Sequence, residues 1–216
     1  MKRFFTLFLA ASTALLATAQ TKSDPEAKKV LDAVSAKFRT YKAPQATFTY
    51  TVENAQGKAL STQKGTVTMK GSKYRVAIPG MDIYSDGRTN WNYDKNANEV
   101  TIKEVDGAGG ELTPQKLFTN FYDRDFLYKL NGDKKIAGKT VQEIELTPMN
   151  KNRPFHKVYL LVDKATRTLY SARILEKNGN RYSYTINSFK PTVAVTDAQF
   201  VFNKAKYPGV EVVDLR

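Results

Sequence analysis

The chain has 216 residues, with 34 Lys and Arg against 21 Asp and Glu, and a formal net charge of +13. It has no cysteine and a single histidine, His156, which excludes a disulfide framework, a cysteine nucleophile and a cysteine-based metal site. Such a charge draws a protein toward anionic surfaces such as phospholipid headgroups or nucleic acid. Because the lysines are spread over nearly every segment, simple solubility explains the charge equally well.

The first residues have the pattern of an export signal. Lys2 and Arg3 precede an uncharged stretch at 4–17, and Ala17-Thr18-Ala19 matches the small-x-small pattern of a signal peptidase site. We therefore expect a signal peptide at 1–19, cleaved after Ala19, and a single domain at 20–216. The uncharged stretch is too short for a membrane-spanning helix, and no later stretch approaches the roughly 20 apolar residues that a span requires.

A helix is predicted directly after this signal. Ser23-Asp24-Pro25-Glu26 offers a capping residue, an early proline and a glutamate three residues after the serine. Apolar residues then recur at helical spacing up to Tyr41, and Pro44 ends the pattern. One apolar stripe on an otherwise charged helix predicts that the helix covers the apolar face of a sheet.

From Ala46 onward the period changes to two, which indicates β-strands. Turn signals separate the strands at 54–58, 71–72, 79–80, 86–87, 94–98, 131–132 and 178–179. Because these connections are short, neighbouring strands should be antiparallel. About ten or eleven such strands with two helices predict one mainly β domain whose sheet curls into a barrel or half-barrel.

The hairpin at 83–93, with its Asp86-Gly87 turn, holds the only tryptophan. Thr89, Trp91 and Tyr93 alternate with polar residues, so one face of this arm is largely aromatic. Trp91 is either a core anchor or part of the lining of a cavity, and the alternation fits both interpretations.

A glycine-rich stretch at 106–110 precedes a short, very apolar helix predicted from Thr113-Pro114 to the aspartates Asp123 and Asp125. Leu117, Phe118, Phe121 and Tyr122 cluster on one side of it. The helix is either part of the core or a lid that moves on a glycine hinge.

Catalytic patterns are not found. The sequence has no Gly-x-Ser-x-Gly elbow and no His-rich or carboxylate-rich metal spacing, and its aromatic residues do not form a nucleic-acid platform. We expect His156 to be a polar surface residue and the pair Asp123 and Asp125 to serve in capping and ion pairs. The predictions are therefore no enzyme, no cofactor, no metal and no nucleic acid.

The sequence resembles the periplasmic outer-membrane lipoprotein carrier proteins over essentially the whole expected domain. The resemblance lies in QATFTY at 45–50, SDGRTNWNY at 85–93, LTP at 112–114, DAQFVF at 197–202 and PGV at 208–210. It implies an incomplete, unclosed antiparallel β-barrel with a helical lid, whose interior holds the acyl chains of lipoproteins crossing the periplasm. In well-known family members an arginine followed by a proline precedes the third strand, and that arginine is tied to opening and release of the cargo. This chain has Lys70-Gly71-Ser72-Lys73 there, so neither residue has a counterpart.

The resemblance and the apolar faces together predict an acyl-chain cavity. Its expected lining residues come from both helices and from the strands: Val30, Leu31, Val34, Phe38, Phe48, Tyr50, Tyr74, Val76, Trp91, Tyr93, Leu117, Phe118, Phe121 and Tyr122. The implied partners are acylated lipoproteins or lipids, an inner-membrane lipoprotein-releasing transporter and an unidentified outer-membrane acceptor, and the carrier is expected to be a periplasmic monomer. A lipid-binding or envelope-stress-sensing interaction module on the same scaffold is the alternative. Whether the cargo is lipoprotein, phospholipid or glycolipid stays open.

Overall fold

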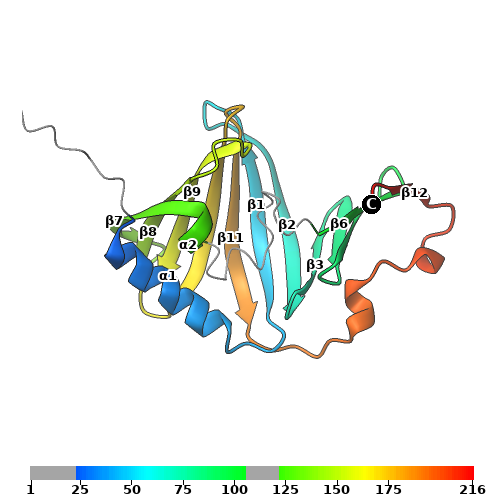
Figure 1. The fold of residues 1–216 in the computed structure, drawn as a ribbon, viewed down its shortest axis with the longest axis horizontal. Helices are drawn as coiled ribbons and strands as arrows, with labels where there is room; N and C mark the ends of the chain where they lie inside the picture. Colours follow the sequence, from blue (N-terminus) through cyan, green and yellow to red (C-terminus); the bar gives the residue numbers. More distant parts are fainter. Residues whose placement is uncertain (1–22, 106–121) are drawn as a thin grey trace, which may run out of the picture.

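The computed structural model describes residues 23–105 and 122–216. Two α-helices and a 12-stranded sheet make up the fold in these ranges (Figure 1). The elements are α1 (Pro25–Phe38), β1 (Gln45–Glu53), β2 (Ala59–Lys70), β3 (Lys73–Ile78), β4 (Met81–Ser85), β5 (Thr89–Asp94), β6 (Glu99–Glu104), α2 (Tyr122–Asp125), β7 (Phe126–Ile136), β8 (Lys139–Pro148), β9 (Phe155–Asp163), β10 (Thr168–Glu176), β11 (Arg181–Lys190) and β12 (Glu211–Asp214). The predicted mainly β, unclosed architecture is confirmed, with more strands than expected. No helix in the described ranges has the length and apolar character needed to cross a membrane.

The strand order is β12-β6-β5-β4-β3-β2-β1-β11-β10-β9-β8-β7, so β12 and β7 are the two edges. Most neighbours are consecutive antiparallel strands, as short turns require. Two pairings are non-local, because β1 joins β11 and β12 runs parallel to β6. Pairing of β1 with β11 brings the two halves of the chain into one curved sheet (Figure 1).

Of two predicted glycine-containing turns, the structure confirms one and contradicts the other. The Asp86-Gly87 turn is confirmed: Asp86 Oδ1 accepts hydrogen bonds from the backbone N–H groups of Arg88 and Thr89, both at 2.8 Å. The predicted turn at 131–132 is wrong, since β7 continues through it with a register shift and Gly132 at φ 106°. A glycine with positive φ can form a β-bulge, in which one strand has an extra residue relative to its partner. The chain turns into β8 only at 137–138, where both residues have positive φ.

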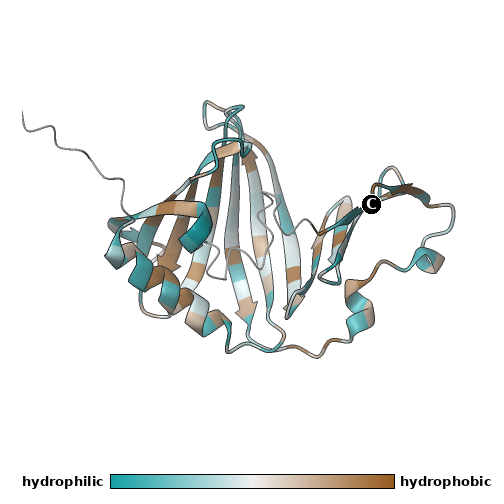
Figure 2. Cartoon of the chain, in the orientation of Figure 1, coloured by the Kyte–Doolittle hydropathy of each residue, from teal (hydrophilic) through white to brown (hydrophobic). Residues whose placement is uncertain are grey.

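Helix α1 covers part of the inner face of the sheet. Asp24 is its N-cap and accepts a 2.8 Å hydrogen bond from the Glu26 N–H; its other carboxylate oxygen accepts from Leu130 N–H at 3.0 Å. The predicted apolar stripe is confirmed, with Leu31 and Val34 buried against β7 and β10. In Figure 2 hydrophilic and hydrophobic colours alternate along the elements, as expected of helices and strands that bury one side.

The outer face of β4–β6 has a second core of its own. Phe202 and Val210 of the C-terminal segment pack there against Tyr84, Tyr93 and Val100. Phe202 lies 5.9 Å from Tyr84 and 5.4 Å from Tyr93 between ring centroids. This outer cluster explains why both faces of the sheet carry aromatic residues.

The C-terminal segment is also held by charge. Asp197 pairs with Lys73 at 2.7 Å and with Lys70 at 2.9 Å, and these two ammonium groups lower the pKa of its carboxyl to about 2. Since the folded pKa is below the usual 3.8, the stabilisation is present above pH 4 and is lost as the pH falls toward about 2. We expect a carboxyl ¹³C titration to give a pKa of about 2 for Asp197, rising toward 3.8 in the Lys70→Gln/Lys73→Gln variant. An unchanged value in that variant would show that the two lysines are not the cause.

Candidate functional site

The inner face of the sheet has a filled half and an open half. Under α1, side chains of β7–β10 such as Val158 and Leu160 are buried. The two described α-helices have their main contacts with β7 and β10, and not with β11, β1, β2, β3 or β4. The apolar side chains there are only half-buried, and we call them the open inner face: Tyr50, Val76, Ile78, Ile83, Ile174, Tyr184 and Ile186.

Gly65 shapes the floor of the open inner face. A Cβ atom at this position would lie 2.5 Å from Phe48 Cζ, 2.6 Å from Ile78 Cγ2 and 2.9 Å from the Ala77 carbonyl oxygen. Only glycine therefore lets the Phe48 ring and the Ile78 side chain lie against the strand here. Because position 65 has no side chain, Phe48 and Ile78 lie close to the sheet, which leaves space over them on the open inner face.

Tyrosine rings make up one wall. Tyr50 stacks with Tyr184 at 5.0 Å and with Tyr182 at 6.2 Å, and Phe48 lies 6.1 Å from Tyr184. Burial raises the pKa of both Tyr50 and Tyr184, so both phenols stay neutral at physiological pH. The wall is aromatic and uncharged, which suits apolar ligands.

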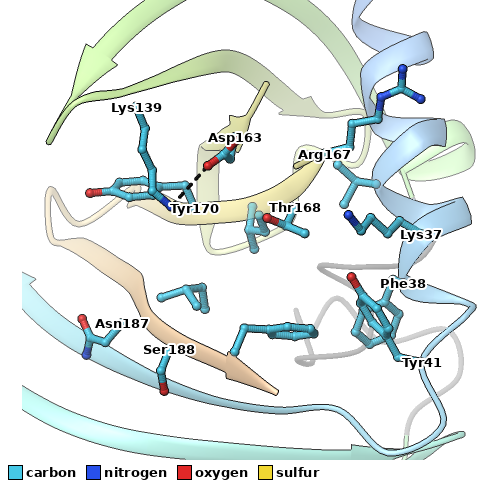
Figure 3. Close-up of a pocket in the computed structure, with 14 residues that line it drawn as sticks. Lys37, Phe38, Tyr41, Lys139, Asp163, Arg167, Thr168, Tyr170, Asn187 and Ser188 are labelled. Atoms are coloured by element: carbon cyan, nitrogen blue, oxygen red, sulfur yellow. Dashed lines mark ion pairs between the residues drawn. The ribbon is translucent and has the colours of Figure 1, made fainter. Parts of the chain in front are cut away.

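A pocket of about 150 Å³ adjoins this face at the C-terminal end of α1 (Figure 3). Its apolar lining comes from α1, the segment that follows α1, β10 and β11, and consists of Val34, Phe38, Tyr41, Leu169, Ile186 and Phe189. Tyr41 lies 6.0 Å from Phe38 and 5.0 Å from Phe189 between ring centroids. An engineered apolar cavity of similar volume holds benzene, so this pocket has room for a ring or the end of one hydrocarbon chain.

Charged groups surround the pocket, and all of them except Asp163 are exposed. Lys37 Nζ donates a 2.6 Å hydrogen bond to the Thr166 carbonyl, Lys139 pairs with Asp163 at 3.3 Å, and Arg167 also lines the pocket. Turn hydrogen bonds from the backbone N–H of Thr166 lower the pKa of Asp163, with Lys139 acting in the same direction, so this carboxylate is ionised. The pocket is thus apolar within and mainly cationic around it.

Most of the predicted lining residues meet in one place. The inner cluster contains Val30, Leu31, Val34, Phe38, Phe48, Tyr50, Tyr74, Val76 and Tyr122. Tyr122 links α2 to α1, because its hydroxyl donates a 2.7 Å hydrogen bond to Asp32 Oδ1. Leu117, Phe118 and Phe121, and with them most of the predicted lid helix and its glycine hinge, lie outside the described residues.

Trp91 and Tyr93 are placed differently from the prediction. Trp91 lies opposite Tyr84 and Tyr93 opposite Asp82, so both belong to the outer cluster and face away from Tyr74 and Val76. Alternation shows which residues share a face but cannot show which face is inside, and here the C-terminal segment covers the other one. The structure therefore favours the core-anchor interpretation of Trp91 over the cavity interpretation.

Several open-face residues were not among the predicted lining. Ile78, Ile83, Ile174, Tyr184 and Ile186 come from strands whose alternation was readable in the sequence. The missing information was the pairing of β1 with β11, which puts Tyr184 directly opposite Tyr50. Aromatic residues at both 182 and 184 were the signal that could have suggested it.

The polar candidates have structural partners. Asp125 pairs with the buried Arg153 at 3.1 Å, and the Arg153 guanidinium lies 5.2 Å from the centroid of Phe126. Asp123 pairs with Lys28 at 3.2 Å. His156 is exposed at the start of β9. The described ranges hold no group of three or more His, Cys, Asp or Glu that could bind a metal ion.

Comparisons with known proteins point to one family. The family described as outer membrane lipoprotein carrier protein LolA matches residues 39–203. The outer-membrane lipoprotein carrier protein of Cupriavidus necator is 33% identical over 111 residues, covering 49% of this chain and 51% of that protein. Its counterpart in Cupriavidus pinatubonensis is 32% identical over 128 residues, covering 54% and 57%. The chain thus spans about half the length of the curated relatives it matches.

A solved structure supports the fold. The crystal structure of an uncharacterized conserved protein from Thermus thermophilus superimposes with a TM-score of 0.59 at 16% identity. The match covers 88% of this chain and 99% of that chain. At this identity the likeness shows a shared fold alone.

Proposed function

Since the chain belongs to the outer membrane lipoprotein carrier protein family, we propose that it carries acylated lipoproteins through the periplasm, with their acyl chains held on the open inner face. The family is one of carriers, and in the proposal the protein binds its cargo without chemistry. The proposed partners are an inner-membrane transporter that supplies the lipoprotein and an outer-membrane acceptor that receives it. The observation that carries the proposal is an apolar inner face that α1 covers over only half its width.

The energetics of acyl chains require such a shelter. Burial of each methylene is worth about 0.8 kcal/mol, so one long chain exposed to water costs on the order of 10 kcal/mol. The half under α1 is already filled by buried side chains, so the chain has to lie over β11, β1, β2, β3 and β4. Ile186 belongs both to this face and to the 150 Å³ pocket, which gives the chain end a place to enter.

The far side of the inner face suits the polar part of a lipoprotein. Strand register places Asn92 opposite Ile83 and Thr101 opposite Asn92, so these half-buried polar groups continue the inner face across β5 and β6. Amide and hydroxyl groups can bond the esters and peptide backbone next to the acyl chains. In the proposed orientation the chains cross β11–β4 and the peptide leaves over β5 and β6.

A charge placed on the open inner face tests the proposal. We expect Ile83→Asp to weaken binding of a synthetic triacylated lipopeptide at least tenfold, because the acyl chain would have to desolvate the new carboxylate. Isothermal titration calorimetry with the folded variant measures this, and circular dichroism checks the fold.

Thr66→Asp is the matched control, since Thr66 lies opposite Ala77 and faces the outer side of the same sheet. It should bind like the unchanged protein. Equal affinities for all three proteins, or no binding by the unchanged protein, would contradict acyl binding on the inner face.

A further inference from the structure

One end of the half-barrel carries a group of exposed cations. Strand directions bring the α1–β1 connection, the β9–β10 turn and the end of β11 to the same end of the sheet. We call the exposed basic residues there the cationic rim: Lys37, Arg39, Lys42, Arg167 and Lys190. No ion pair joins any of them to an acidic residue in the described ranges.

Backbone contacts show that the rim is one continuous surface. Lys37 of α1 reaches the β9–β10 turn through its 2.6 Å hydrogen bond to the Thr166 carbonyl. Lys190 lies opposite Gln45, and Ala43 forms a bridge with Thr192, so the segment that carries Lys42 runs beside the end of β11. The helix end, the turn and the strand end therefore present their charges together.

Neighbouring carboxylates do not neutralise the rim. Asp32, two turns before Arg39, pairs with Lys28 at 3.1 Å. Three other described carboxylates toward this end have lysine partners: Asp163 has Lys139 at 3.3 Å, Asp133 has Lys164 at 2.7 Å, and Asp197 has both Lys70 and Lys73. The positive charge of the rim is thus left facing solvent.

The opposite end of the sheet differs. There Asp94, Glu99 and Glu176 lie at strand ends near turns that also hold Lys58 and Lys151. Both signs of charge occur among these residues. The cationic rim, in contrast, is made of exposed basic residues alone.

We propose that the cationic rim docks the protein on a bilayer surface that contains anionic phospholipids. The half-buried aromatic rings of Tyr41 and Phe189 lie at the same end, and tyrosine, with a polar tip on an apolar ring, favours the boundary between headgroups and acyl chains. The apolar pocket is at this end too, so docking brings it close to the lipid. Long, separate basic side chains suit a laterally mobile lipid surface better than a protein surface, where charges are fixed in place. The inference goes beyond the proposed function and does not depend on the cargo.

Vesicle flotation tests the inference with residues 20–216, the chain expected after signal cleavage. The protein should float with vesicles of equal parts phosphatidylcholine and phosphatidylglycerol, stay unbound with pure phosphatidylcholine, and be released by high salt. Vesicles with phosphatidylserine in place of phosphatidylglycerol should bind the protein equally well, because the attraction to the cationic rim depends on the charge of the lipid and not on the shape of its headgroup. Each basic residue near an anionic surface contributes about fivefold to the affinity. The double variant Lys42→Glu/Lys190→Glu loses two such residues, so its vesicle affinity should fall at least 25-fold, which is about fivefold for each lysine.

Lys58→Glu/Lys151→Glu is the control, since it makes the same change in net charge at the opposite end. It should keep most of the vesicle affinity. Equal losses in both double variants would overturn the inference in favour of net charge alone, and absence of flotation would overturn it in favour of another partner such as an acidic protein. Lipopeptide binding is measured separately on the same proteins: binding without flotation defeats docking only, and flotation without binding defeats the proposed function only.

Discussion

Replacement of Phe202 by alanine is expected to lower the free energy of unfolding by about 3–5 kcal/mol, the usual cost of removing a buried phenyl ring. Phe202 contacts three aromatic residues of the outer cluster: Tyr84, Tyr93 and Tyr207, the last at 4.8 Å. Without the ring, the C-terminal segment loses these three aromatic contacts, two of which join it to β4 and β5. Urea unfolding measures the loss, and amide hydrogen exchange should show faster exchange in β12, whose pairing with β6 depends on this attachment.

Val201→Ala is the neighbouring control. Val201 is 38% exposed, so its truncation should cost less than about 1 kcal/mol. If Phe202→Ala costs no more than this control, the outer cluster is not a core and the segment is held by other contacts.

Gly65→Ala is expected to destabilise the protein by about 2–3 kcal/mol, although alanine normally favours folding over glycine. The new methyl group would overlap the tip of Phe48 at 2.5 Å and the Ile78 side chain at 2.6 Å. One of them has to rise into the space above the inner face, so lipopeptide affinity should fall together with stability. Thermal unfolding and calorimetric titration measure the two effects.

A second substitution separates overlap from other causes. Phe48→Leu removes the ring atom that the new methyl group meets first, so Gly65→Ala/Phe48→Leu should be less destabilised than the two single changes added together. Strict additivity would show that Gly65 does not act by making room for Phe48.

Local features of the fold were predictable from the sequence. The apolar stripe of α1 and the Asp86-Gly87 turn depend on residues a few positions apart, and the structure confirms both. The strand periodicity predicted either a barrel or a half-barrel. The family resemblance decided between them, because it implied an unclosed sheet.

Non-local features were not predictable. The Asn-Gly pair at 131–132 has the sequence of a hairpin turn, but the register between β7 and β8 makes it a bulge. Trp91 was assigned to the inside because nothing local shows that Phe202 and Val210 return to cover the outer face. Tyr184 was missing from the predicted site for the same reason: its neighbour Tyr50 is far away in the chain, and their contact depends on the pairing of β1 with β11.

The family's Arg-Pro position has an alternative use here. Lys70 and Lys73 flank the turn between β2 and β3, and both pair with Asp197 of the C-terminal segment. These lysines therefore have a structural role in holding the segment.

Photo-crosslinking shows directly which face of the sheet holds the acyl chain. A lipopeptide whose acyl chain carries a diazirine group is bound to the protein, irradiated, and its attachment sites are mapped by mass spectrometry. Acyl binding on the open inner face should place labels on Tyr50, Val76, Ile83, Ile174 and Tyr184, and none on Phe202 or Trp91 of the outer cluster. Labels confined to the outer cluster, or no labelling beyond that seen with a diazirine probe lacking the acyl chain, would contradict it.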